Sequence, residues 1–387
     1  MSHPISCLTV GRSYSEGILI EKDEKKAEEY FKKAFEISNL NINKKNDNGE
    51  DYLTIAKIYG EGWGQIQDDK KAIKFAEKSC ELQNGNGCTN LAFFYENEKE
   101  FSLDHQKAKE LFEKGCFLES GLSCRNIGLM FEQGLGVDSD YSKAKEYYEK
   151  GIDFDCKISL VNLGNLYKRG RGVKQNYSIA KEYYERACKL KEDEGCLSLG
   201  RLYKQGLGVK QDNQTAKDYY EKACSLNNGY GCSNLGYMYD VGQGVRQDYK
   251  IAKDYYEKAC NLDNGQGCSN LGYMYFEGQG VKQDYKTAKN YYEKACNLDD
   301  GRGCGNLGYM YDVGQGEKQN YKTAKEYYEK ACKLEAGFAC SNLGVLFEQG
   351  QGVRQNSSTA KEFYGKGCDL NDQRGCDNYA RLNKAGL

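Results

Sequence analysis

The chain has 387 residues, and its 55 lysines and arginines nearly balance its 57 aspartates and glutamates, which gives a net charge of −2. The two signs alternate along the chain, so bulk charge gives it no attraction for nucleic acid or for an anionic membrane. No apolar run approaches the roughly 18 residues that a membrane-spanning helix needs, and the opening segment lacks the charged and apolar regions of an export signal.

The chain is built from a repeated unit of 36 residues. The segment from Gly231 to Gln266 recurs almost verbatim from Gly267 to Arg302 and from Gly303 to Phe338, with looser copies on both sides. Repetition at a fixed period of this length is typical of a solenoid, in which each unit packs only on its neighbours. We therefore predict one elongated domain instead of two or three globular ones.

The repeat register divides the chain into three predicted parts. Residues 1–49 form a divergent first repeat, whose Lys/Asn-rich connector from Ser38 to Gly49 is expected to be a flexible loop. Residues 50–374 hold an array of nine further repeats, and residues 375–387 add one helix that caps the array. Trp63 is the only tryptophan, and its position between two glycines predicts an exposed turn residue.

Each unit contains the patterns of two short helices. In the central copy, the apolar residues between Cys232 and Tyr239 share one stripe and predict a helix, called helix A. Two glycines follow, and Asp248 is suited to cap a second helix, called helix B. An Asn/Gly-rich turn then leads to the next helix A. In one copy Glu98 and Glu100 replace the turn glycines, so its connection should differ. The pattern predicts an all-α fold, an αα-solenoid.

The cysteines follow the same period. Sixteen of the 18 form pairs spaced eight residues apart: Cys80 and Cys88, Cys116 and Cys124, Cys188 and Cys196, Cys224 and Cys232, Cys260 and Cys268, Cys296 and Cys304, Cys332 and Cys340, Cys368 and Cys376. On one continuous helix such residues lie about 12 Å apart, too far for a disulfide, but the turn between helix B and the next helix A can bring them together. We therefore predict eight disulfides.

One copy of the repeat supports the pairing. Both cysteines are missing from it, and Ile152 and Leu160 stand in their places, as expected if the two positions are in contact. Buried free thiols and a metal site are the alternatives. The metal is the weaker one, because zinc ligands usually follow a closer spacing and the chain has only two histidines. Cys7 and Cys156 have no partner in this scheme and are predicted to be free thiols.

The repeat resembles a known family. The resemblance to Sel1-like repeats covers essentially the whole chain, and the paired cysteines resemble those of the cysteine-rich secreted proteins of Helicobacter and related bacteria. It is carried by Leu235, Gly236, Tyr239, Gly242, Gly244, Val245, Ala252, Tyr256, Ala259 and Cys260. It implies a right-handed superhelix of Sel1/TPR-like repeats that acts as an adaptor or binding protein in an oxidising compartment.

The resemblance also implies an alternative function and a choice of locations. Members of the cysteine-rich branch are described as penicillin-binding proteins with weak β-lactamase activity. Another relative, a cytochrome oxidase assembly factor of the mitochondrial intermembrane space, is similar in having cysteine-bearing Sel1 repeats. We expect a secreted or periplasmic protein, with the cytoplasm and the intermembrane space as alternatives.

The residues themselves give little sign of catalysis. A serine β-lactam hydrolase needs an S-x-x-K motif together with supporting motifs. The chain has S-x-x-K at Ser142, Ser178 and Ser358, but all three fall at one position of the repeat, and no S-D-N or K-T-G accompanies them. We expect no cofactor and no metal, and we favour a non-enzymatic scaffold, with the β-lactam hydrolase as the alternative.

A ligand surface is predicted on the face of helix A opposite its core stripe. Amides and phenol rings recur there and would suit an extended peptide or a protein partner, with a β-lactam or peptidoglycan-like molecule as the alternative. Alternatively, each asparagine bonds a neighbouring repeat and each tyrosine packs between repeats. The candidate residues are Asn234, Tyr237, Asn270, Tyr273, Asn306, Tyr309 and Asn342.

Overall fold

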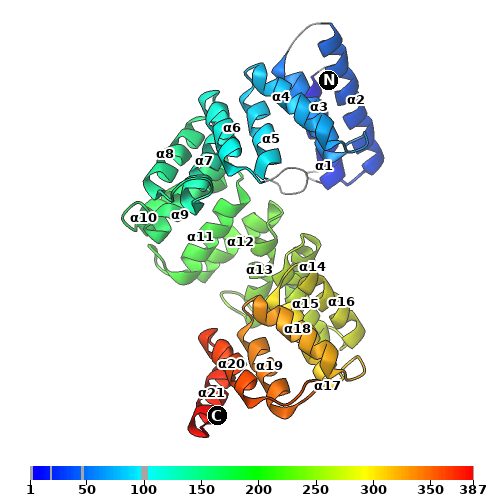
Figure 1. Cartoon of the computed structure of the whole chain (residues 1–387), viewed down its shortest axis with the longest axis vertical. Helices are drawn as coiled ribbons and strands as arrows, with labels where there is room; N and C mark the ends of the chain where they lie inside the picture. The colour runs from blue at the N-terminus through cyan, green and yellow to red at the C-terminus, as the bar shows by residue number, and fades with distance from the viewer. Residues whose placement is uncertain (1–2, 18–19, 45–47, 97–102, 387) are drawn as a thin grey trace. The chain divides into compact units, whose positions relative to one another are not determined.

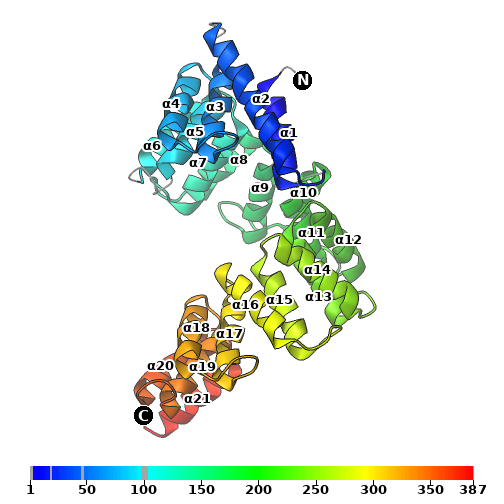
Figure 2. The same ribbon diagram turned by 90° about the vertical axis from the view of Figure 1, so that its right-hand side faces the viewer.

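The computed structural model describes residues 3–17, 20–44, 48–96 and 103–386, and within these ranges the chain forms helices joined by turns, with no strands. Its internal contacts define two units, unit 1 (Met1–Leu190) and unit 2 (Lys191–Leu387). Figures 1 and 2 show the helices of each unit arranged as consecutive hairpins. The prediction of an all-α solenoid is confirmed, whereas the boundaries at residues 49 and 374 stay a prediction.

Unit 1 contains ten helices among its described residues, and unit 2 contains eleven. Those of unit 1 are α1 (Pro4–Glu16), α2 (Glu24–Asn43), α3 (Gly49–Glu61), α4 (Asp69–Glu81), α5 (Gly85–Glu96), α6 (His105–Phe117), α7 (Gly121–Gln133), α8 (Tyr141–Asp153), α9 (Lys157–Arg169) and α10 (Tyr177–Lys189). Those of unit 2 are α11 (Asp193–Gln205), α12 (Asn213–Ser225), α13 (Gly229–Val241), α14 (Tyr249–Asn261), α15 (Gly265–Glu277), α16 (Tyr285–Asn297), α17 (Gly301–Val313), α18 (Tyr321–Lys333), α19 (Gly337–Gln349), α20 (Ser357–Asp369) and α21 (Gln373–Lys384). Odd-numbered helices are helix A of a repeat, and even-numbered helices are helix B.

The predicted connector loop after the first repeat is wrong over its first part. The helix α2 is 20 residues long and continues through Asn43, because fully buried Ser38 extends the apolar stripe of Phe31 and Ala34 by one more turn. Residues 45–47 of that connector lie outside the described residues, as do Glu98 and Glu100.

The helices α13, α15 and α17 each end at a glycine. Gly242 has φ of 72°, the left-handed conformation that glycine adopts without steric cost, and it terminates α13. Gly244 also has positive φ and packs against the backbone of Asn213 at the start of α12, where no side chain would fit. Asp248 then caps α14 by accepting hydrogen bonds from the backbone N–H groups of Lys250 and Ile251 at 3.0 and 3.1 Å.

Disulfides join each of these helix B elements to the helix A that follows. Cys260 at the end of α14 and Cys268 in the first turn of α15 have Cα atoms 4.5 Å apart. Six further bridges have the same spacing, with Cα separations of 4.4 to 4.8 Å: Cys80–Cys88, Cys116–Cys124, Cys224–Cys232, Cys296–Cys304, Cys332–Cys340 and Cys368–Cys376. Cys188 and Cys196 are disulfide-bonded as well. Disulfide bonding, predicted from the spacing, is therefore present in the fold.

The remaining two cysteines are not bonded. Cys7 is fully buried in the core of the first repeat, and Cys156 is the half-buried residue that precedes α9. In the repeat that lacks the cysteine pair, Leu160 is buried and Ile152 packs against the surrounding core. The apolar pair therefore contributes packing where the other repeats have a covalent bond.

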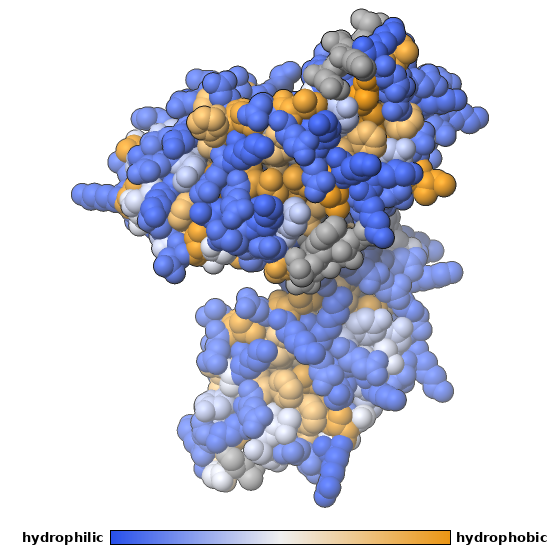
Figure 3. All heavy atoms as spheres, turned by 45° about the horizontal axis from the view of Figure 1, so that its top comes forward, coloured by the Kyte–Doolittle hydropathy of each residue, from blue (hydrophilic) through white to orange (hydrophobic). Residues whose placement is uncertain are grey.

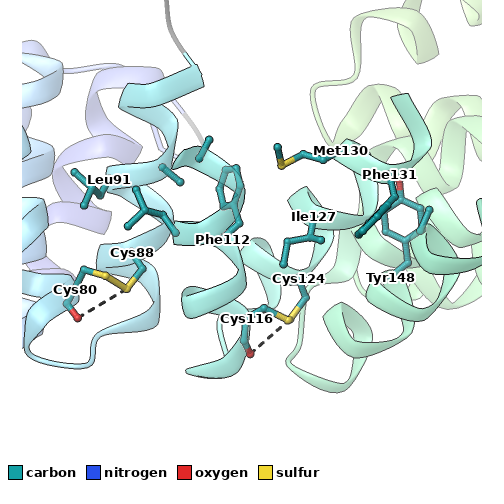
Figure 4. Packing of buried hydrophobic residues seen from close by; sticks show 14 of the residues in the cluster. Cys80, Cys88, Leu91, Phe112, Cys116, Cys124, Ile127, Met130, Phe131 and Tyr148 are labelled. Carbon is teal, nitrogen blue, oxygen red and sulfur yellow. Dashed lines mark hydrogen bonds between the residues drawn. A yellow bond between two sulfur atoms is a disulfide. The ribbon is translucent and has the colours of Figure 1, made fainter. Parts of the chain in front are cut away.

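Tyrosine fills the core between the two helices of a hairpin. Tyr256 of α14 is fully buried, and its ring lies so close to Gly236 of α13 that a β-carbon there would be 2.7 Å from the ring. Beside it, the rings of Tyr239 and Tyr255 stack with centroids 5.9 Å apart. The same arrangement recurs along the chain, and Figure 4 shows its counterpart around Tyr148 together with two disulfides of unit 1. Much of the tyrosine content is thus structural.

Within each unit, helix B packs against the helix A that follows it, and most successive A helices also contact one another. In unit 2, α13 contacts α15, α15 contacts α17, and α17 contacts α19, whereas among the described residues no comparable contact joins two successive B helices. The A helices therefore share one side of each array, which we call its inner side. That this side is the concave one stays a prediction. Hydrophilic side chains cover most of the face shown in Figure 3, with apolar side chains exposed in patches between them. None of the described helices has both the length and the apolar character needed to cross a membrane.

Candidate functional site

Three tyrosines line up on the inner side of unit 2. Tyr237, Tyr273 and Tyr309 lie on α13, α15 and α17, and their exposed fractions are 39, 45 and 41%. The tyrosines of the hairpin cores, such as Tyr256 and Tyr328, are fully buried. Because successive A helices contact one another, the three exposed rings form a row across three repeats, which we call the tyrosine ladder. The sequence places these rings on the face of helix A opposite its core stripe, and their exposure agrees with that placement. Their role as a ligand surface stays a prediction.

Contacts with neighbouring repeats cover part of the ladder. The Lys204 ammonium lies 4.7 Å from the centre of the Tyr237 ring, and the Phe276 ring meets Tyr309 edge-on with centroids 6.2 Å apart. Tyr237 and Tyr309 therefore each contact a neighbouring repeat, as the alternative predicts, while about two fifths of each residue stays exposed. Rings of this exposure, held in place by neighbours, can cover the side chains of a bound chain.

The predicted asparagines are less free than the tyrosines. Asn234 uses its amide group to donate a hydrogen bond to the carbonyl of Tyr230 in its own helix, at 2.9 Å. Asn342 accepts a hydrogen bond from Arg374 of the next repeat at 3.4 Å. For Asn270 and Asn306, by contrast, the described residues provide no hydrogen-bond partner to the side chain. Two of the four amides are therefore available to a ligand.

A half-buried carboxylate lies beside the ladder in two repeats. The Tyr256 hydroxyl donates a hydrogen bond to one carboxylate oxygen of Asp240 at 3.1 Å, and the Tyr328 hydroxyl does the same to Asp312 at 3.0 Å. Burial raises the pKa of both carboxyl groups, although the tyrosine hydrogen bond acts in the opposite direction. Within the described chain, neither carboxylate forms an ion pair with a lysine or arginine.

In two other repeats, the residue at this position is a glutamate that is paired with an arginine. Glu348 also accepts a hydrogen bond from a buried tyrosine, Tyr364, but it is paired with Arg381 of the capping helix at 2.7 Å. In unit 1, Glu132 accepts from Tyr148 and lies 3.8 Å from Arg171. The carboxylates of Asp240 and Asp312 therefore differ from their counterparts in lacking a cation from the protein itself.

In two of the three S-x-x-K motifs the lysine is paired with a carboxylate. Ser142, Ser178 and Ser358 are exposed in the first turn of helix B. In the first motif Lys145 pairs with Glu149 at 2.7 Å, and this hydrogen bond raises the lysine pKa. Lys181 of the second motif pairs with Glu185 at 3.0 Å. A lysine held in its charged form by a carboxylate is poorly suited to accept a proton from serine.

Unit 1 contains a hollow that the sequence did not predict. It has a volume of about 420 Å³ and is lined by residues of α1, α3 and α5, together with Trp63. The expectation that Trp63 is an exposed turn residue is wrong, since its ring is half-buried and stacks on Phe31 at 4.9 Å. Two cations, Arg12 and Lys57, line the hollow together with two carboxylates, so its charge favours neither an anionic nor a cationic ligand.

One sequence signal could have located the carboxylates. An acid at the end of helix A is followed 16 residues later by the buried tyrosine of helix B, as in Asp240 and Tyr256 or Asp312 and Tyr328. The hydrogen bond between them was not predicted, because neither residue was among those assigned to the ligand surface. The hollow beside Trp63 depends on the packing of three divergent repeats and had no comparable signal.

The chain is similar to one protein family and to several solved structures. The family model of the Sel1 repeat matches ten segments: residues 4–38, 55–84, 86–116, 121–153, 158–192, 193–228, 229–264, 265–300, 302–335 and 337–372. No curated protein sequence matches the chain.

Among solved structures, a Sel1 repeat protein from Oxalobacter formigenes is 25% identical, with a TM-score of 0.58 over 65% of this chain and 99% of its own. Cysteine-rich protein B of Helicobacter pylori is 41% identical over 36% of this chain and 99% of its own, with a TM-score of 0.29. A protective antigen of uropathogenic Escherichia coli is 22% identical over 99% of this chain and 88% of its own, with a TM-score of 0.49.

Proposed function

The chain belongs to the Sel1 repeat family, and on this basis we propose that it is a non-enzymatic scaffold that binds a protein or an extended peptide along the inner surface of unit 2. The observation that carries the proposal is the tyrosine ladder. A solenoid whose core tyrosines are fully buried exposes three more at one repeat position, on the side where its A helices contact one another. Exposed aromatic rows of this kind are enriched where proteins bind partners.

The disulfides support a location outside reducing compartments. Seven bridges have Cα separations below 5 Å, and Cys188 and Cys196 are disulfide-bonded as well. Such bonds form and persist in oxidising environments and are rare in the cytosol. A secreted or periplasmic scaffold is therefore the form of the proposal that we favour.

The alternative of a β-lactam hydrolase gains no support from the site. Its three candidate serines are exposed at helix starts, and the lysines of two motifs are already paired with carboxylates. A small-molecule substrate would also need an enclosed pocket, and the tyrosine ladder is an open surface. We therefore do not propose this activity.

The ladder is tested by selecting binders from a displayed library of random peptides on the oxidised full-length protein. The variant Tyr237→Ala/Tyr273→Ala/Tyr309→Ala should weaken binding of the selected peptides at least about 100-fold, because aromatic anchors in an interface each contribute about 2 kcal/mol or more. Fluorescence anisotropy gives the dissociation constants, and circular dichroism shows whether the fold is kept.

The matched control changes three exposed residues at one position of helix B, Lys250→Ala/Lys286→Ala/Lys322→Ala. It should leave the affinity unchanged, since these side chains lie on the other helix of each hairpin. Selected peptides that bind the tyrosine variant as tightly as the wild type would place the binding surface elsewhere.

A further inference from the structure

Two half-buried carboxylates of unit 2, those of Asp240 and Asp312, form no ion pair with any described lysine or arginine. One oxygen of Asp240 is held by Tyr256, and one oxygen of Asp312 by Tyr328, which fixes the orientation of each group and leaves the second oxygen free. Both aspartates lie in the last turn of an A helix, α13 or α17. The carbonyl groups at a helix C-terminus carry partial negative charge, so they add to the attraction for a cation.

The charged groups around the two aspartates do not neutralise their negative charge. Glu277 of α15 is exposed between the two aspartates, and together with Asp240 it contributes, after burial, to the raised pKa of Tyr273. Arg302 of α17 is exposed and acts electrostatically on Tyr256, but it forms no ion pair with Asp240 within the described residues. Asp240 follows Tyr237 by three residues on α13, as Asp312 follows Tyr309 on α17, so each carboxylate neighbours a ring of the tyrosine ladder.

The other repeats show what completes such a site. Where the same position is Glu348, Arg381 of the capping helix supplies the cation, with both carboxylate oxygens within 2.7 Å of one guanidinium nitrogen. Where it is Glu132, Arg171 lies close by. Between the two unpaired aspartates, the position is occupied by Phe276, which packs against Tyr309. The order along the surface is therefore carboxylate, aromatic ring, carboxylate.

From this complementarity we infer that the occupant of the tyrosine ladder is an extended peptide with two basic side chains, one bound by Asp240 and the other by Asp312, and an apolar side chain between them on Phe276. The inference rests on the proposed function and specifies its partner. Adjacent helices pack about 8–10 Å apart, so α13 and α17 are separated by about 16–20 Å. An extended chain covers this length in about five or six residues.

Three labelled synthetic peptides test the inference, each acetylated and amidated so that its ends carry no charge. The first is Arg-Ser-Gly-Tyr-Ser-Gly-Arg, the second is its isomer Arg-Arg-Ser-Gly-Tyr-Ser-Gly, and the third replaces both arginines of the first by glutamate. The oxidised full-length protein should bind the first at least about tenfold more tightly than the isomer, because only the first can reach both carboxylates. The acidic peptide should bind most weakly.

The decisive variant is Asp240→Asn/Asp312→Asn, which should weaken binding of the first peptide at least about tenfold and abolish its preference over the isomer. The control Asp254→Asn/Glu326→Gln changes the net charge equally on exposed positions of helix B and should have no effect. Equal binding of the first peptide and its isomer, or binding that survives the aspartate variant, would overturn the inference.

Stability measurements separate this role from a structural one. Because burial raises the folded-state pKa of both aspartates, their contribution is most favourable at acidic pH and is lost as the pH rises through those raised values. At neutral pH, the asparagine variant should therefore melt no earlier than the wild type, since asparagine still accepts the tyrosine hydrogen bond.

A separate outcome identifies failure of the proposed function itself. If library peptides bind through the tyrosine ladder but carry no pair of basic residues, the inference falls and the proposed function stands. If the first peptide binds the ladder variant with unchanged affinity, both the inference and the proposed location are wrong.

Discussion

Removing one disulfide, with Cys260→Ala/Cys268→Ala, is expected to lower the free energy of unfolding by about 2–3 kcal/mol. The bridge closes a loop of only eight residues, and the chain-entropy model gives this magnitude for a loop of that length. Because each repeat is stabilised only by its neighbours, the loss should appear first as separate melting of the repeats around α14 and α15. Urea unfolding followed by circular dichroism measures the change.

Two controls define the origin of this loss. The variant Cys156→Ala removes an unbonded cysteine and should leave the unfolding midpoint almost unchanged. The variant Cys260→Ile/Cys268→Leu copies the pair found at residues 152 and 160, and it should recover part of the stability through apolar packing. An alanine variant as stable as the oxidised wild type would show that the bridges do not hold the array together.

A side chain at Gly272 should strongly destabilise the core. Gly272→Leu is expected to lower the free energy of unfolding by about 3 kcal/mol or more, because a β-carbon at this position lies 2.7 Å from the fully buried ring of Tyr292. Because the ring is buried, it can make room for leucine only by displacing its neighbours in the hairpin of α15 and α16. Thermal and urea unfolding of the oxidised protein measure the effect.

A matched pair of alanine substitutions tests the steric explanation. Gly272→Ala should destabilise the protein. Gly60→Ala in α3 should stabilise it by about 0.5–1 kcal/mol, because a β-carbon there makes only ordinary contacts at 3.5 Å and alanine has the higher helix propensity. In a double-mutant cycle, Tyr292→Ala should relieve part of the cost of Gly272→Leu. A full cost in the double variant would contradict the proposed clash.

The fold could be predicted closely because the repeat makes every local signal occur many times. The glycines after helix A, the cap at Asp248 and the cysteines at a spacing of eight each recur in register, and the structure places them where these patterns require. The exceptions lie in the divergent repeats. The helix α2 extends into the expected loop because buried Ser38 continues the buried stripe of this helix. The polar residues around Ser38 made this segment look like a loop in the sequence.

The site was predicted less completely, because a helical stripe identifies a face but not the contacts made across helices. The exposure of Tyr237, Tyr273 and Tyr309 followed from their position on helix A. The bonding of Asn234 to its own helix, and that of Asp240 to a tyrosine of the following helix, depend on side-chain geometry that the spacing does not specify. The hollow beside Trp63 likewise depends on three repeats that differ from the others.

The most direct test of the account is photocrosslinking on the oxidised full-length protein. A benzophenone amino acid is introduced in place of Tyr273 on the inner surface or of Asn290, an exposed residue of helix B in the same hairpin. Each variant is irradiated with a peptide selected from the library. Binding along the inner A helices predicts crosslinking from position 273 and none from position 290. Crosslinking from position 290 alone would contradict the claim that the inner A helices of unit 2 form the binding surface.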